Sequence, residues 1–216
     1  GASVYSASKL GAEEFPDYDV SLRSAVSIGR RIQDPLAELV KIDPKSIGVG
    51  QYQHDMNQKR LGEALGGVVE DCVNSVGVDL NTASPALLSY VAGIHATVAK
   101  NILKYREEHG KFTARRELLK VAKLGPKAYE QCAGFLRLPE SEMPLDRTGV
   151  HPESYAAAEG LLALCGYGLA DVAAKRVGGL AKKIKSPEKT AAELGIGVPT
   201  LEDIMRELEK PGRDPR

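Results

Sequence analysis

Apolar residues recur at helical spacing along most of this chain, with polar residues between them. A clear case follows Asp19, where apolar residues from Val20 to Ile32 fall on one face. Asp is a favoured N-cap, and this spacing is typical of an amphipathic helix. The same pattern predicts helices over residues 7–15, 34–42 and 56–76, the second with Asp34 as N-cap and Pro35 in its first turn.

The first six residues depart from the helical period. They alternate in polarity, and Val4 and Tyr5 are good strand formers, so residues 1–6 are predicted to be a short strand. A lone strand leaves its backbone N–H and C=O groups unpaired. Either this strand pairs with another chain or the sheet to which it belongs is missing, and the second case would make this chain one piece of a longer protein.

The middle of the chain contains an internal repeat with a period of 30 residues. Each copy is predicted to be helix, tight turn, helix: 84–91, 92–94 and 95–108 in the first, then 115–121, 123–125 and 126–136 in the second. Two such units can bury their apolar faces against each other as a small four-helix core. The equivalent pairs are Leu88 and Leu118, Val91 and Val121, Ala92 and Ala122, Ile94 and Leu124, Ala99 and Tyr129, Ile102 and Cys132, and Tyr105 and Phe135.

A polar, proline-containing stretch at 140–152 is predicted to be a linker. Further helices are predicted over 153–164, 170–176 with a continuation at 180–184, 187–194 and 200–208. The tail 210–216 is predicted to be a loop leading into a part of the protein that this chain lacks.

Composition excludes several classes of protein. Hydrophobic residues make up 43% of the 216 residues and charged residues 27%, which excludes a disordered chain. No apolar run approaches the ~20 residues of a membrane span, so no membrane partner is expected. Three cysteines lie far apart, which argues against a disulfide framework or zinc site and favours the reducing cytoplasm.

The formal net charge of zero hides an uneven distribution. Residues 1–80 carry a net charge of −4, residues 81–139 of +6, and residues 140–216 of −2. A compact basic segment between acidic flanks suggests a polyanionic partner for the middle of the chain. The alternative is a solvated lysine-rich face.

The two tight turns, at 92–94 and 123–125, suggest how the basic segment could bind an anion. Glycine allows a backbone to approach a ligand closely, and the helix that follows presents free N–H groups and the positive end of its dipole. Together these hold a phosphate without reading a base. Each turn keeps only one glycine, however, so the alternative is that the turns merely connect packed helices. The predicted nucleic-acid-binding residues are Gly93, Ile94, His95, Ala96, Lys100, Lys104, Arg115, Arg116, Lys120, Lys123, Gly125 and Lys127.

A third glycine-flanked turn, Gly195-Ile196-Gly197, has the best glycine spacing for this motif. The helix after it carries Glu202, Asp203, Glu207 and Glu209, which would repel phosphate. We interpret this turn as structural or as facing a protein.

Several stretches together resemble the Tex family of bacterial transcription accessory proteins. They include GASVYSAS (1–8), IDPKSIGVGQYQHD (42–55), VEDCVNSVGVDLNTAS (69–84), EQCAGFLRL (130–138), PLDRTGVHPESY (144–155) and ELEKPGRDPR (207–216). The resemblance implies a mainly α fold, with sequence-nonspecific nucleic-acid binding in transcription. It also implies a longer parent protein that carries an RNase H-like (YqgF) domain before this segment and an OB-fold RNA-binding domain after it. The implied parts are 1–42, the remnant of the YqgF-like domain; 43–80, a loop and long helix; 81–139, a tandem helix-hairpin-helix module; and 140–216, a second helical module.

The resemblance raises an enzymatic alternative, because RNase H-like folds can hold metal through several carboxylates. Asp34 and Glu38 fall on one helical face, but capping already explains Asp34, and a two-metal site needs more carboxylates. Motifs for nucleotide, zinc or serine chemistry are absent. We therefore expect no enzyme activity, no metal and no cofactor. The expected partner is RNA or DNA, contacted at its phosphates, with transcription machinery as a further partner; the competing hypothesis is a scaffold that orients neighbouring domains.

Overall fold

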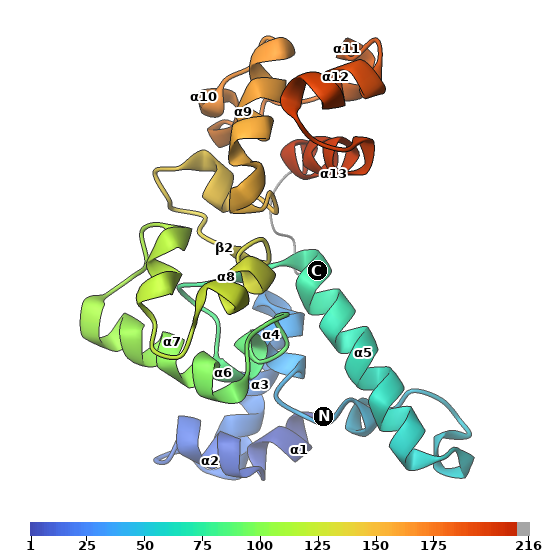
Figure 1. Ribbon diagram of the computed structural model, residues 1–216. Helices are drawn as coiled ribbons and strands as arrows, with labels where there is room; N and C mark the ends of the chain where they lie inside the picture. The colour runs from blue at the N-terminus through green and yellow to red at the C-terminus, as the bar shows by residue number, and fades with distance from the viewer. Residues whose placement is uncertain (211–216) are drawn as a thin grey trace.

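The computed structural model describes residues 1–210 and is built almost entirely of helices, which confirms the mainly α fold (Figure 1). Its strands, β1 (Val78–Asp79) and β2 (Leu136–Arg137), form one short parallel ladder. The loop predicted at 211–216 lies outside the described residues. Within the described part of the chain, no helix is long and apolar enough to cross a bilayer.

Four short helices open the chain: α1 (Ala2–Ser6), α2 (Lys9–Glu14), α3 (Val20–Gln33) and α4 (Pro35–Leu39). The strand predicted for residues 1–6 is therefore wrong. This segment is α1, which packs against α3 and leaves Tyr5 only 1% exposed. Tertiary burial of Tyr5 overrides the strand preference of Val4 and Tyr5.

The predicted N-caps are confirmed. Asp19 Oδ1 accepts a hydrogen bond from Leu22 N–H at 2.8 Å, and Asp34 Oδ1 accepts one from Ala37 N–H at 3.0 Å. The apolar stripe of α3, in contrast, is largely uncovered. Ile28 is 53% exposed and Ile32 is 75% exposed, so this stripe finds no cover among residues 1–210.

Helix α5 (Gln58–Val76) extends from the body as a long arm (Figure 1). Two 3₁₀ turns, η1 (Pro44–Ile47) and η2 (Gln53–Asp55), precede it, and Asn57 caps its first turn. Leu61 and Val73, near its two ends, are buried, whereas Val68 in the middle is 57% exposed. The predicted apolar face is therefore covered only near the ends of the arm.

The repeat forms the first core, as predicted. Its elements are α6 (Pro85–Leu88), α7 (Ala96–His109), the 3₁₀ turn η3 (Arg115–Lys120) and α8 (Pro126–Cys132). Equivalent residues of the two copies, such as Leu88 and Leu118, are fully buried. The β1–β2 ladder closes this unit, with Val78 N–H donating to Phe135 O at 2.8 Å.

A second core lies above the first in the view of Figure 1. Leu161, Leu180 and Leu201 are at its centre and are fully buried. Two 3₁₀ turns, η4 (Pro144–Arg147) and η5 (Pro152–Ser154), lead into it. Its helices are α9 (Tyr155–Leu164), α10 (Leu169–Ala173), α11 (Leu180–Lys183), α12 (Pro187–Leu194) and α13 (Val198–Glu209).

The stretch 140–152, predicted to be a linker, is instead packed between the two cores. Leu145, Asp146 and Val150 in this stretch are each at most 3% exposed. Their backbone converges on Arg115, whose side chain is buried at 1% exposure and whose own N–H donates to Asp146 Oδ2 at 3.1 Å. The guanidinium donates to Leu136 O at 2.8 Å, Val150 O at 2.6 Å, Leu145 O at 3.3 Å, Tyr155 Oη at 2.9 Å and Thr148 O.

We expect Arg115→Met to lower the free energy of unfolding by about 3–5 kcal/mol, because it leaves buried carbonyls without donors and the buried carboxylate of Asp146 without a compensating positive charge. Urea unfolding followed by circular dichroism measures this change. Arg116→Met is the matched control, because Arg116 is exposed, and it should stay within about 0.5 kcal/mol of the parent chain. Equal stability of the two variants would show that Arg115 does not join the cores.

Candidate functional site

The two predicted hairpins share one backbone conformation. The first position has a positive φ, which is 82° at Gly93 and 65° at Lys123. The second position is a buried apolar residue, Ile94 or Leu124, whose N–H donates back to the preceding helix or turn. The third is an extended N-cap, with φ of −88° at His95 and −82° at Gly125.

This geometry explains why each hairpin keeps one glycine at a different end. Only the first position lies in the region that favours glycine, and Lys123 occupies it as an exception. Any residue can adopt the N-cap conformation, so His95 replaces a glycine there at no conformational cost. The missing glycines therefore do not distort the hairpins.

Both hairpins present free N–H groups to solvent. Neither α7 nor α8 has a side-chain cap. Within residues 1–210, no acceptor pairs with the N–H groups of His95 and Ala96 in the first hairpin, or of Gly125 and Lys127 in the second. All four residues are exposed. These N–H groups are free to bind an acceptor from outside the chain.

Two asparagines that the sequence analysis missed hold the hairpins in place. Asn74 of α5 accepts a hydrogen bond from Ala92 N–H at 3.2 Å, just before Gly93. Asn101 of α7 donates to Ala122 O at 2.8 Å, just before Lys123. The sequence did offer a signal for Asn74: it is an amide side chain that directly follows the buried Val73 on an amphipathic helix, a position from which it can bond to a neighbouring segment.

The predicted cationic residues divide into exposed and buried groups. Lys100 and Lys104 are exposed one turn apart on α7, and Lys104 pairs with Glu108 at 3.6 Å. Asn101, next to Lys100 in the sequence, contacts the second hairpin through Ala122 O. Around the second hairpin, the exposed cations are Arg116, Lys120, Lys123 and Lys127.

Two predicted contacts are corrected. The guanidinium of Arg115 is buried and bonded to main-chain carbonyls, so Arg115 cannot reach a phosphate. Ile94 is 3% exposed and its N–H donates to Val91 O at 3.0 Å, so it anchors the hairpin within the core. We therefore assign Arg115 and Ile94 to the fold and not to the interface.

Two other charged residues near the site are directed inward. Burial alone would raise the pKa of Glu117, but hydrogen bonds from Thr113 and from Ala114 N–H outweigh it and hold the pKa below its usual range. Burial lowers the pKa of Arg106, which donates to Leu80 O at 3.0 Å and Ala83 O at 2.9 Å. Both residues fix the backbone that supports the hairpins.

The second core contains two more turns with a positive φ at the first position and an extended N-cap at the third, although their middle residues, Tyr167 and Ile196, are only partly buried. Gly166, with φ of 77°, begins Gly166-Tyr167-Gly168, a motif that the sequence analysis overlooked although its glycine spacing equals that of 195–197. Asp171 Oδ2 accepts a hydrogen bond from Gly168 N–H at 2.9 Å and so fills the N-terminus of α10. At 195–197, Gly195 has φ of 69°, and Glu202 and Asp203 follow on α13. An acidic side chain thus lies at the N-terminus of α10, whereas the first turn of α13 carries none and has no side-chain cap.

The described residues contain no group of three or more His, Cys, Asp and Glu arranged to hold a metal ion. Asp34 Oδ1 caps α4, and Glu38 is buried and pairs with Lys41 at 2.9 Å. Both carboxylates therefore have structural roles in α4 and its surroundings.

Comparison with known protein families gives three matches along the chain. A helix-hairpin-helix motif family matches residues 73–137, an HHH domain family matches 143–216, and the YqgF-like domain of Tex proteins matches 1–33. These matches fall on the two hairpin-bearing cores and the N-terminal helices.

Curated relatives match across essentially the whole chain. The chain is 59% identical to Protein YhgF of Escherichia coli K12 and 58% identical to the transcriptional accessory protein Tex of Neisseria gonorrhoeae, over all 216 of its residues. It is 40% identical to the human S1 RNA-binding domain-containing protein 1 over 98% of its length. The chain spans 27%, 28% and 26% of the length of these three proteins.

We expect Gly93→Ala to destabilise the chain by about 1–3 kcal/mol, because its φ is positive and a Cβ there would lie 2.7 Å from Gln131 Cβ. Gly125→Ala is the matched control. Its φ is negative and no atom would approach its Cβ within 4 Å, so its effect should stay within about 0.5 kcal/mol. Thermal unfolding of both variants tests the assignment of the two positions, and a larger loss at Gly125 would contradict it.

Proposed function

This chain belongs to the Tex family of transcription accessory proteins, and we propose that its first core binds the phosphate backbone of RNA or DNA with little sequence preference. The observation that carries the proposal is the pair of exposed, uncapped helix N-termini at His95–Ala96 and Gly125–Lys127. Exposed lysines and arginine surround them.

The chemistry of the hairpins favours phosphate over bases. Free N–H groups at a helix N-terminus bind anions, and such contacts carry no sequence information. Base stacking would need exposed aromatic side chains. Near this site, Phe112 is buried and stacks on Tyr105 with ring centroids 4.8 Å apart, so these rings stabilise the fold.

The printed names of the relatives agree with this class of partner. One relative is a transcriptional accessory protein, and another is named for an RNA-binding domain. We propose that the parent protein acts in the cytoplasm at nucleic acid engaged in transcription, with transcription machinery as a further partner.

A second candidate function comes from the second core. Its hairpins also begin with a positive φ, but Asp171 occupies the N-terminus of α10, and Glu202 and Asp203 lie on α13 beyond its first turn. Acidic groups close to these turns repel phosphate. We propose that these two hairpins are structural or face a protein, which keeps a scaffold role for this half of the chain.

We propose binding without cleavage. The capping role of Asp34 and the ion pair of Glu38 with Lys41 support this, because neither carboxylate is held ready for a metal. Incubation with labelled single-stranded RNA and DNA in Mg²⁺ or Mn²⁺ tests it. Metal-dependent cleavage that Asp34→Asn abolishes would establish the nuclease alternative instead.

We expect Lys100→Glu combined with Lys127→Glu to weaken nucleic-acid binding and to reduce the log–log salt slope by about 0.7–0.9 for each phosphate that is no longer bound. Fluorescence anisotropy of labelled single- and double-stranded oligonucleotides at two salt concentrations measures both quantities. The control reverses two lysines far from the hairpins in sequence, Lys9→Glu and Lys59→Glu, both exposed.

The scaffold hypothesis predicts instead that the chain does not bind oligonucleotides at low salt, or that the hairpin variant binds them as tightly as the parent chain. Absence of binding at low salt would reject the proposed function. Binding that the control variant weakens as much as the hairpin variant would show that net charge, and not the hairpins, holds the nucleic acid.

A further inference from the structure

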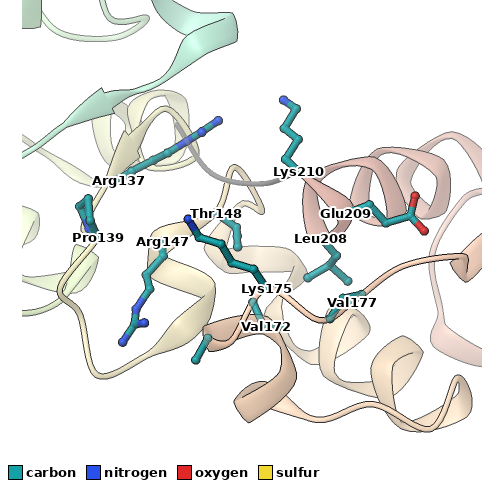
Figure 2. Close-up of a pocket in the computed structure, with 11 residues that line it drawn as sticks. Arg137, Pro139, Arg147, Thr148, Val172, Lys175, Val177, Leu208, Glu209 and Lys210 are labelled. Carbon is teal, nitrogen blue, oxygen red and sulfur yellow. The ribbon is translucent and has the colours of Figure 1, made fainter. Parts of the chain in front are cut away.

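A pocket of about 340 Å³ lies at the junction of the two cores (Figure 2). Four cationic side chains from separate parts of the chain line it: Arg137 of β2, Arg147 of η4, Lys175 after α10 and Lys210 after α13. None of them belongs to the hairpins. The pocket is therefore a second basic site, separate from the one described above.

The acidic residues at this pocket leave it with excess positive charge. Glu209 points away from Arg137 in Figure 2, and its Oε1 accepts a hydrogen bond from Leu180 N–H at 2.7 Å. Glu207 lies 3.7 Å from Arg137 and 2.5 Å from Lys210. Glu207 thus offsets part of the charge of Arg137 and Lys210, whereas Arg147 and Lys175 form no ion pair within residues 1–210.

The other two cations at the pocket, Arg147 and Lys175, differ in how far they are already bonded within the chain. Arg147 donates to Ser141 O at 2.9 and 2.6 Å, and its guanidinium points away from Arg137 in Figure 2, so it forms a wall. Lys175 is exposed, and none of the ion pairs within residues 1–210 includes it. Its Nζ lies on the side of the pocket that faces β2 in Figure 2.

The backbone at Lys175 supplies an independent observation. Among the described residues, positive φ outside glycine occurs at Lys123 and at Lys175, where it is 55°. Glycine is the residue that this conformation favours. Both exceptions are lysines, one in the second hairpin and one at this pocket, so each places a charge where the backbone alone would favour glycine.

A second hollow lies beside the pocket and extends to Asn74 of α5. It has a volume of about 230 Å³ and shares Arg137 and Lys210 with the pocket. Its lining also includes Asn74, the residue that bonds Ala92 in the first hairpin. This hollow therefore lies between Asn74 and the pocket, and Glu207 lines it together with Arg137 and Lys210.

We propose that the junction pocket binds a phosphate of the same nucleic-acid strand that the hairpins hold, through Lys175 and Lys210, while the guanidinium of Arg137, which is 4% exposed, adds positive charge behind them. This inference rests on the proposed function. Charge-assisted hydrogen bonds from Arg and Lys to phosphate are strong, and a partly enclosed pocket screens them less than an open surface does. Glu207 competes for two of the three cations and so limits the affinity.

The test compares variants of the whole chain by fluorescence anisotropy with a long and a short labelled single-stranded oligonucleotide. Lys175→Gln with Lys210→Gln should weaken binding of the long oligonucleotide and lower its salt slope by about 0.7–0.9 for each phosphate released from the pocket. The short oligonucleotide, which cannot reach from the hairpins to the pocket, should be unaffected. Lys185→Gln with Lys189→Gln removes two exposed lysines that do not line the pocket, and should leave both affinities unchanged.

Glu207→Gln separates a binding role from a structural one. It removes the competing charge, so the long oligonucleotide should bind more tightly although the variant gives up an ion pair. Unchanged or weaker binding in this variant, with the thermal unfolding temperature of the parent chain, would overturn the proposal.

The remaining outcomes distinguish the two proposals. If the hairpin variant loses binding and the pocket variant does not, the pocket proposal is wrong and the proposed function stands. If the parent chain binds no oligonucleotide, both are wrong. Inorganic phosphate could raise the unfolding temperature of the parent chain but not of the variant at Lys175 and Lys210, while both bind oligonucleotides equally well. In that case the pocket binds free phosphate and the proposal is likewise wrong.

Discussion

The burial of one guanidinium holds the two halves of this molecule together. A charge taken out of water is costly unless hydrogen bonds and an opposite charge compensate it. At Arg115 the compensation comes from carbonyls of β2 and of the 140–152 stretch, with Asp146 beside it and Tyr155 at the start of α9. One side chain thereby fixes the end of the first core, the connection and the entry to the second. The positions of the hairpins and of the junction pocket relative to each other follow from it.

The four hairpins show how one backbone serves different purposes. Each has a positive φ at its first position, at Gly93, Lys123, Gly166 and Gly195. What differs is the side chain near the helix N-terminus: Asp171 fills one of the second pair, whereas His95 and Gly125 leave the first pair open. Fold alone does not assign function here, because the local charge decides whether a phosphate is attracted or repelled.

Sequence reasoning succeeded where the determining contacts are local. The caps Asp19 and Asp34 act on residues three positions away, and the repeat follows from periodicity, so these features could be read directly. It failed where distant contacts decide. Arg115 looks like one of several basic surface residues because its partners lie 21 to 40 residues away. The same cause hid the packing of 140–152 and of α1. At the site, the turns and exposed lysines were predictable, whereas the supporting roles of Asn74 and Asn101 depend on neighbours 18 and 21 residues away.

The arm α5 links two distant regions mechanically. A helix of 19 residues is about 28 Å long at the usual rise per residue, and it bends little along that length. Near the C-terminal end of α5, Asn74 is hydrogen-bonded to the first hairpin. Just before its N-terminal end, Tyr52 and Met56 are largely exposed to solvent. The arm therefore behaves as a lever: a tilt imposed at its outer end reaches the hairpin as a change in angle, so whatever restrains that end also sets the orientation of the hairpin.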